Sequence, residues 1–271
     1  MSTSRSEDFL LFSGGQDHNN MTIITCRSNL EYLCTARLIL ADGTFYVSPK
    51  YFYQMYTLHV HINGRYFPLV FAMLERKTEA TYVQFLQKII EQCASMGLLF
   101  QPEQVIVDFD TATQIAFQSI FQAVSILCCR FHMGQAIYRK ILQLGLSNDY
   151  KNKDRANGKW LKLFFGLPFL DPSEVGDCFA EDIMCDAPSL APYEAFADYM
   201  LNTYITDHSL FPPIKWAALP QERNPRTNNA AESFHAHLKK YFSTPHQLYL
   251  SGNITRKNYV ARLSYKFLPV S

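Results

Sequence analysis

The sequence predicts an α/β fold with a mixed, five-stranded sheet, and three observations support this. Two apolar runs, residues 37–45 and 105–110, contain aspartates at their ends and are typical of strands buried on both faces. A strand–turn–strand pattern with an Asn-Gly turn at residues 63–64 follows the first run. Segments with helical periodicity then alternate with further strand-like runs.

The first half of the fold follows from turn chemistry and periodicity. Residues 53–62 and 66–74 flank the Asn-Gly turn, so with residues 37–45 they form an antiparallel meander. Residues 80–94 have apolar side chains at spacings of three and four, which indicates a helix with one face on the sheet. The stripe that we expect on this face consists of Val83, Leu86, Ile90 and Cys93.

The second half adds two strands and two helices. After the strand at 105–110, we expect Thr111 to cap a helix, residues 125–133 to form the fifth strand and residues 134–146 to form another helix. The order is therefore βββαβαβα. A meander followed by two right-handed crossovers is the layout of the ribonuclease H-like sheet, in which the first and fourth strands are neighbours.

The chain is expected to divide into four segments. Residues 1–30 are a loosely constrained N-terminal segment with a short edge strand at residues 22–26, and residues 31–149 hold the first part of the core. Residues 150–222 are helical in period, rich in proline and without strand-like runs, which indicates an all-helical insertion. Residues 223–271 return to the core as a closing helix and a tail.

Composition and charge limit the class of protein. The chain has 271 residues, 48% hydrophobic content and seven cysteines without a CxxC pair, as expected for an intracellular globular protein. It has neither a secretory signal nor a membrane-spanning run. Two basic blocks, residues 130–162 and 215–271, flank the acidic block 167–214. The basic blocks either form a positive face that binds phosphates or belong to a solvated surface of mixed sign.

Three acidic residues are candidates for a metal site. Asp42 and Asp108 come at the carboxyl ends of strands that we expect to be neighbours, where α/β sheets bind ligands. Glu232 lies in the first turn of the closing helix. Such carboxylates hold two Mg²⁺ ions, with Mn²⁺ as the alternative, that clamp the attacking and leaving oxygens of a phosphodiester.

Each acid also has a structural interpretation. Asp42 before Gly43 fits an ordinary turn, and either Asp108 or Asp110 fits the cap of the following helix. Glu232 follows Asn229 by three residues, the spacing of a capping box.

Several motifs occur in an order that resembles the Mutator-like element (MULE) transposase domain over residues 30–240. They are ADGTF, VDFDTA, CRFHMGQAIYRK and PRTNNAAESFH. The resemblance implies a DDE-type nuclease and strand transferase with a ribonuclease H-like core and a helical insertion before the last acid. By motif position it assigns catalysis and metal binding to Asp42, Asp108 and Glu232, and the C-x-x-H motif to Cys129 and His132.

Partners follow from this interpretation. We expect DNA as substrate, with phosphate contacts from Arg139, Lys140, Arg226 and Lys239, no small-molecule substrate, a nuclear location, and a homo-oligomer as in other transposases. Zinc is not expected at the C-x-x-H motif, because structural zinc sites favour more thiolates. The expected reaction is cleavage of a DNA strand followed by attack of the freed 3′-hydroxyl on target DNA. The alternative is a domesticated or truncated derivative that binds DNA or protein without cutting.

Overall fold

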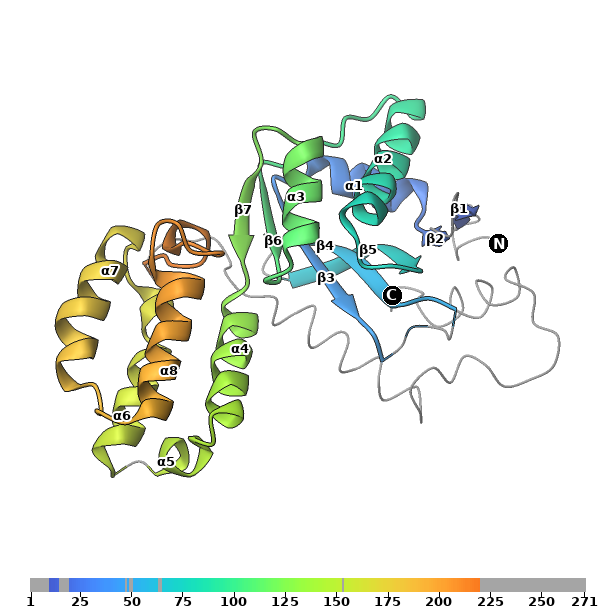
Figure 1. Cartoon of the computed structure of the whole chain (residues 1–271). Helices are drawn as coiled ribbons and strands as arrows, with labels where there is room; N and C mark the ends of the chain where they lie inside the picture. The colour runs from blue at the N-terminus through green and yellow to red at the C-terminus, as the bar shows by residue number, and fades with distance from the viewer. Residues whose placement is uncertain are drawn as a thin grey trace. The chain divides into compact units, whose positions relative to one another are not determined.

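The structure, a computed structural model, describes residues 10–14, 20–46, 48, 51–62, 65–152 and 154–219. Two compact units divide these residues, with the boundary between Ile126 and Leu127 (Figure 1). The expected four-segment division of the chain stays a prediction, because it also depends on residues 220–271.

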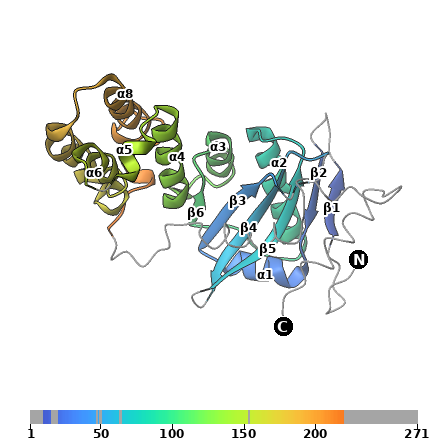
Figure 2. The same ribbon diagram turned by 90° about the horizontal axis from the view of Figure 1, so that it is seen from below.

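A mixed sheet forms the centre of the first unit, and in the described residues it has seven strands in the order β1-β2-β5-β4-β3-β6-β7. The strands are β1 Leu10–Gly14, β2 Met21–Ile24, β3 Leu38–Thr44, β4 Gln54–Ile62, β5 Arg65–Leu74, β6 Gln104–Val107 and β7 Ser125–Cys128. Figure 2 shows β3, β4 and β5 side by side, with β2 and β1 beyond β5. The α/β class with a mixed sheet is thereby confirmed.

The strand pairing confirms the expected meander and the expected pairing of its first strand with the fourth predicted strand. β4 pairs antiparallel with both β3 and β5, and β3 pairs parallel with β6. The expected count of five strands was wrong, since β1 and β2 extend the described sheet beyond β5. The run at 22–26 does form a strand, but β1 covers its free edge and all four residues of β2 are buried.

The described residues of the first unit form three helices. They are α1 Arg27–Thr35, α2 Glu79–Ser95 and α3 Thr111–Ile120. The sequence did not predict α1. Thr78 caps α2 by accepting a hydrogen bond from the Thr81 amide, whereas α3 is capped by Asp110 and not by Thr111 as expected.

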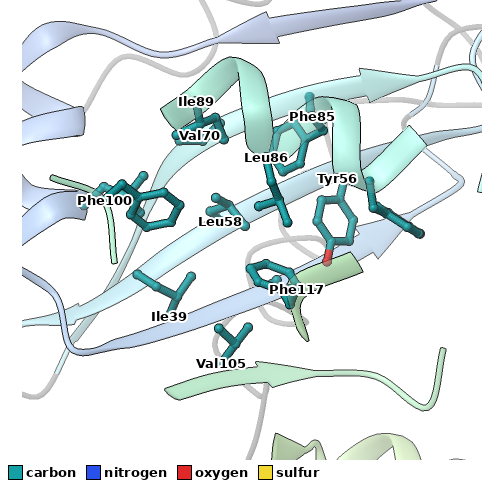
Figure 3. Close-up of a cluster of buried hydrophobic side chains, with 14 of the residues drawn as sticks. Ile39, Tyr56, Leu58, Val70, Phe85, Leu86, Ile89, Phe100, Val105 and Phe117 are labelled. Atoms are coloured by element: carbon teal, nitrogen blue, oxygen red, sulfur yellow. The ribbon is translucent and has the colours of Figure 1, made fainter. Parts of the chain in front are cut away.

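The core of this unit lies between α2, α3 and one face of the sheet. Figure 3 shows Phe85, Leu86 and Ile89 of α2 packed near Leu58 of β4 and Val70 of β5. The expected stripe on α2 was wrong in part. Leu86 and Cys93 are buried, but Val83 and Ile90 are only half-buried, because the helix turns the larger aromatic side chains toward the sheet. The buried positions of α2 are Thr81, Tyr82, Phe85, Leu86, Ile89 and Cys93.

The second unit is helical throughout its described residues beyond β7. Its α-helices are α4 Arg130–Gln143, α5 Ser147–Lys151, α6 Ala156–Leu163, α7 Val175–Asp177 and α8 Ala191–Met200. Short 3₁₀ turns and π-helical turns, the latter at Cys178–Ile183 and Leu201–Ile205, join them. The all-helical character expected for residues 150–222 is thus found in residues 150–152 and 154–219. None of the described helices is long and apolar enough to span a bilayer.

Aromatic side chains form the core of the second unit. The Trp160 ring packs edge-on against Phe164 at 4.9 Å, and its indole nitrogen donates to the Ile183 carbonyl at 2.8 Å. Trp216 is fully buried and donates to the Phe211 carbonyl at 2.8 Å. Both indoles therefore bury a large apolar surface while their N–H groups keep hydrogen-bond partners.

The expected strand at residues 125–133 was too long. β7 ends at Cys128 and α4 begins at Arg130. Met133, Ile137 and Ile141 are the buried residues of α4, and their spacing of four is that of a helix. The apolar run from Ser125 to Met133 therefore contains the end of a strand and the first turn of a helix.

Candidate functional site

Three parallel strands of the first unit end at one edge of the sheet. Since β4 is antiparallel to both β3 and β5, the strands β3, β5 and β6 all run in the same direction. Leu40 of β3 pairs with Ile106 of β6, so Asp42 and Asp108 each lie two residues beyond a paired position. The carboxyl edge of parallel strands is where open α/β sheets bind ligands.

Asp42 lies inside β3 and only 2% of it is exposed. It pairs with Thr57 of β4, whose hydroxyl donates to the Asp42 carbonyl oxygen at 3.2 Å. His59 Nε2 lies 2.9 Å from the same hydroxyl oxygen, and both Thr57 and His59 are buried. The interpretation of Asp42 as a turn residue was therefore wrong, because it occupies the interior of a central strand.

Asp108 follows the last residue of β6 and is more accessible, with 33% of its side chain exposed. Its backbone carbonyl accepts a hydrogen bond from Gln114 Nε2 at 3.3 Å. Its carboxylate lies 3.8 Å from Lys77 Nζ. Asp108 thus presents a carboxylate at the edge of the sheet, with its backbone held by α3.

Asp110 is the residue that caps α3. Its Oδ1 accepts a hydrogen bond from the Ala112 amide at 3.3 Å. Its Oδ2 accepts from Tyr82 Oη at 3.1 Å and from Thr113 Oγ1 at 3.2 Å, and Lys77 Nζ lies 3.4 Å away. The capping role that the sequence left open between the two aspartates therefore belongs to Asp110, as is common for Asp at a helix start.

Two buried tyrosines support this end of the sheet. The Tyr82 hydroxyl accepts a hydrogen bond from Gln54 Nε2 at 2.8 Å, and its ring centroid lies 5.0 Å from that of Tyr56. Burial raises the pKa of both phenols well above its ordinary value, and the negative charges of Asp108 and Asp110 raise it further. Both tyrosines are therefore neutral at physiological pH, and Tyr82 is a fixed donor to Asp110.

Lys77, Tyr82, Thr57 and His59 belong to this site but were not identified from the sequence. One signal for Lys77 was present, because it follows β5, a strand that ends at the same edge as β3 and β6. The other three side chains depend on strand register and helix rotation. These are tertiary properties that a single sequence pattern does not specify.

The described residues supply part of the expected metal site. Among them, no group of three or more His, Cys, Asp and Glu side chains comes together in a way that could hold a metal ion. The expected third ligand, Glu232, and the expected phosphate contacts Arg226 and Lys239 lie outside the described residues. Asp42 and Asp108 offer carboxylate oxygens, which are the ligands that Mg²⁺ and Mn²⁺ prefer.

The C-x-x-H motif lies at the start of α4 in the second unit. Cys129 occupies the N-cap position and is fully buried, and His132 is in the first turn. Between them, Arg130 donates to the Ala218 carbonyl, and its guanidinium lies 4.8 Å from the Phe169 ring centroid. The motif therefore fixes the end of the helical segment to α4.

The expected phosphate contacts Arg139 and Lys140 also lie on α4. Arg139 is exposed and donates to the Gln135 carbonyl at 3.2 Å. The Lys140 ammonium lies 4.9 Å from the Tyr199 ring centroid. Both cations remain at the surface of their unit, and their contact with DNA stays a prediction.

Comparison with known proteins adds a family match over part of the chain. No curated protein matches the chain. Residues 38–136, which include β3 to β7 and the first part of α4, match the family model of the MULE transposase domain, and this confirms the family resemblance found in the sequence.

Proposed function

We propose that the chain is the catalytic core of a DDE-type DNA transposase, which cleaves a DNA strand and joins its 3′ end to target DNA. The observation that carries the proposal is the parallel register of β3 and β6, in which Leu40 pairs with Ile106, two residues before Asp42 and Asp108 respectively. The match of residues 38–136 to the MULE transposase domain supports the same reaction class.

The strand order supports a ribonuclease H-like core. The five strands that the sequence predicted follow one another in space as β5-β4-β3-β6-β7. Numbered by chain order these are the third, second, first, fourth and fifth strands, which is the arrangement expected for that fold. In this interpretation β1 and β2 are an addition to the core.

The two described acids have different tasks in the proposed site. Asp42 is held inside a strand, so its carboxylate has a fixed position, whereas Asp108 is one-third exposed and can adjust to a ligand. Asp42, Asp108 and Glu232 would hold the divalent ions, Mg²⁺ or Mn²⁺. Bound there, the ions supply an activated water and stabilise the charge on the leaving oxygen.

The remaining parts of the site position the acids. Asp110 accepts hydrogen bonds from Tyr82 and from the first turn of α3, and therefore fixes the segment that carries Asp108. Arg139, Lys140, Arg226 and Lys239 are the proposed contacts to the DNA backbone. A DNA substrate in turn implies a nuclear location, and pairing of two DNA ends favours a homo-oligomer.

The proposal is tested by nicking of supercoiled DNA in the presence of Mg²⁺. We expect the wild-type chain to nick the DNA and Asp108→Asn to lower the nicking rate by more than about 100-fold. Even the loss of a residue that only hydrogen-bonds a metal ligand lowers metal affinity or activity by about 10- to 100-fold. The matched control is Glu103→Gln. This residue precedes β6 at the opposite end of the strand and pairs with Arg37.

Glu103→Gln is expected to nick DNA at the wild-type rate. Nicking that survives Asp108→Asn would exclude the proposed triad. A chain that binds DNA but never nicks it would instead be the non-catalytic derivative left open by the sequence.

A further inference from the structure

Lys77 lies between two carboxylates at the edge of the sheet. Its ammonium is 3.8 Å from Asp108 Oδ2 and 3.4 Å from Asp110 Oδ2. Only 28% of the lysine side chain is exposed, so both pairs are partly shielded from water. The two acids have different functions, because Asp110 caps α3 whereas Asp108 is a proposed metal ligand.

A lysine ammonium and a divalent cation cannot use the same carboxylate oxygen in the same way. An ammonium beside Asp108 stabilises the carboxylate charge and lowers its attraction for a second cation. A divalent ion carries twice the charge and bonds oxygen at a much shorter distance, about 2.1 Å for Mg²⁺. Entry of the ion at Asp108 Oδ2 therefore places two cations beside one carboxylate oxygen and favours movement of the ammonium away from it.

We propose that Lys77 is a positioning residue that competes with the divalent cation for Asp108 and, once displaced, is available to contact a phosphate of the DNA. This inference rests on the proposed function, because it concerns the same acids. The competition keeps Asp108 neutralised until metal binds, which prevents repulsion between neighbouring carboxylates. Lys77 thus couples metal entry to the appearance of a positive charge beside the substrate.

The ammonium also has an aromatic neighbour at the same edge. It lies 5.8 Å from the ring centroid of Phe45, the residue that follows β3, and 47% of Phe45 is exposed. An aromatic face attracts a cation at this distance. The Phe45 ring therefore helps to hold the ammonium at the carboxyl edge, where phosphate oxygens of a bound strand would come.

The inference is tested by measuring Mg²⁺ affinity of the whole chain by calorimetry, without DNA. Lys77→Met removes the ammonium and keeps a long apolar side chain, and we expect it to bind Mg²⁺ roughly two- to fivefold more tightly than wild type, as for loss of a partly exposed ion pair. Lys77→Arg keeps the charge and is expected to show no tightening.

The matched control is Lys88→Met. Lys88 lies on α2, is exposed to a similar extent at 31%, and pairs with Glu91 at 2.7 Å. Lys88→Met changes the net charge by the same amount as Lys77→Met, but at a position away from Asp108 and Asp110. We therefore expect its Mg²⁺ affinity to equal that of wild type. An affinity of Lys77→Met equal to that of Lys88→Met would overturn the inference.

Nicking assays on the same proteins separate this inference from the proposed function. Tighter Mg²⁺ binding by Lys77→Met in a chain that never nicks DNA would support the competition and reject the transposase reaction. Nicking by wild type with no change in the affinity of Lys77→Met would reject the competition alone. No saturable Mg²⁺ binding by the wild-type chain would overturn both.

Discussion

Asp108 and Asp110 are separated by one residue, Phe109, but have different environments. Lys77 lies near both carboxylates, but Asp110 also accepts hydrogen bonds from the Ala112 amide and from two hydroxyl groups. The sequence identified both residues and left open which of them caps α3. It could not separate them, because a cap is defined by the direction of the side chain relative to the first helical turn.

Replacing Asp110 tests its role as a cap. We expect Asp110→Ala to lower the free energy of unfolding by about 2 kcal/mol, because α3 loses its cap and Tyr82 loses its acceptor. Asp110→Asn should cost less, since asparagine caps helices about as well as aspartate. Urea denaturation measures both, and equal losses for the two variants would contradict the capping role.

The raised pKa of Tyr82 predicts a pH dependence of stability. The folded chain keeps the phenol proton above the ordinary pKa of 10.0, whereas the unfolded chain loses it. The stabilisation that the protonated Tyr82 phenol gives to the folded chain is therefore complete below about pH 10. Above that pH the free energy of unfolding falls by up to about 1.4 kcal/mol per pH unit. Tyr82→Phe should make this fall less steep in urea denaturation between about pH 9 and pH 11. An unchanged slope would show that Tyr82 is not the group concerned.

At the scale of elements, the sequence predicted the parts whose patterns are local. The runs that form β3, β4, β5 and β6 were recognised from apolar content and from the Asn-Gly turn. The starts of α1 and α4 were not recognised, because their N-cap residues are Cys26 and Cys129 and not the usual Ser, Thr, Asp or Asn. The extra strand β1 depends on its pairing with β2, a contact that no local pattern shows.

The cap of α2 is expected to stabilise both the helix and the segment that carries Lys77. Thr78 Oγ1 accepts from the Thr81 amide at 3.3 Å and lies 2.8 Å from the Thr81 hydroxyl. Thr78→Ala should lower the free energy of unfolding by about 1 kcal/mol. The control is Ser95→Ala at the exposed end of the same helix, where the hydroxyl donates to the Gln92 carbonyl. A loss in urea denaturation no larger than that of the control would contradict the capping role.

At the scale of the whole molecule, the chain forms two units with separate cores. The first packs helices on a sheet, and the second packs aromatic side chains between helices. The change to helical periodicity near Tyr150 predicted a helical segment, but not that the helical unit begins earlier, at α4. Helical periodicity alone does not say whether α4 packs on the sheet or joins the helices that follow it.

Both tryptophans of the chain, Trp160 and Trp216, lie in the second unit. Their fluorescence should therefore follow unfolding of that unit, while circular dichroism follows both. Leu86→Ala creates a cavity in the first core and should lower the stability seen by circular dichroism by about 2–5 kcal/mol, with a smaller change in the fluorescence transition. Equal shifts in both signals would mean that the chain unfolds as one cooperative unit.

We expect Asp42 and Asp108, each two residues beyond a paired position of the parallel strands β3 and β6, to share a divalent cation. The most direct test is a crystal structure of the chain with Mn²⁺, which stands in for Mg²⁺ and is located by its anomalous scattering. We expect an Mn²⁺ peak within about 2.5 Å of a carboxylate oxygen of each aspartate. Anomalous peaks that all lie away from both residues, or a peak bound by Asp110 instead of Asp108, would contradict it.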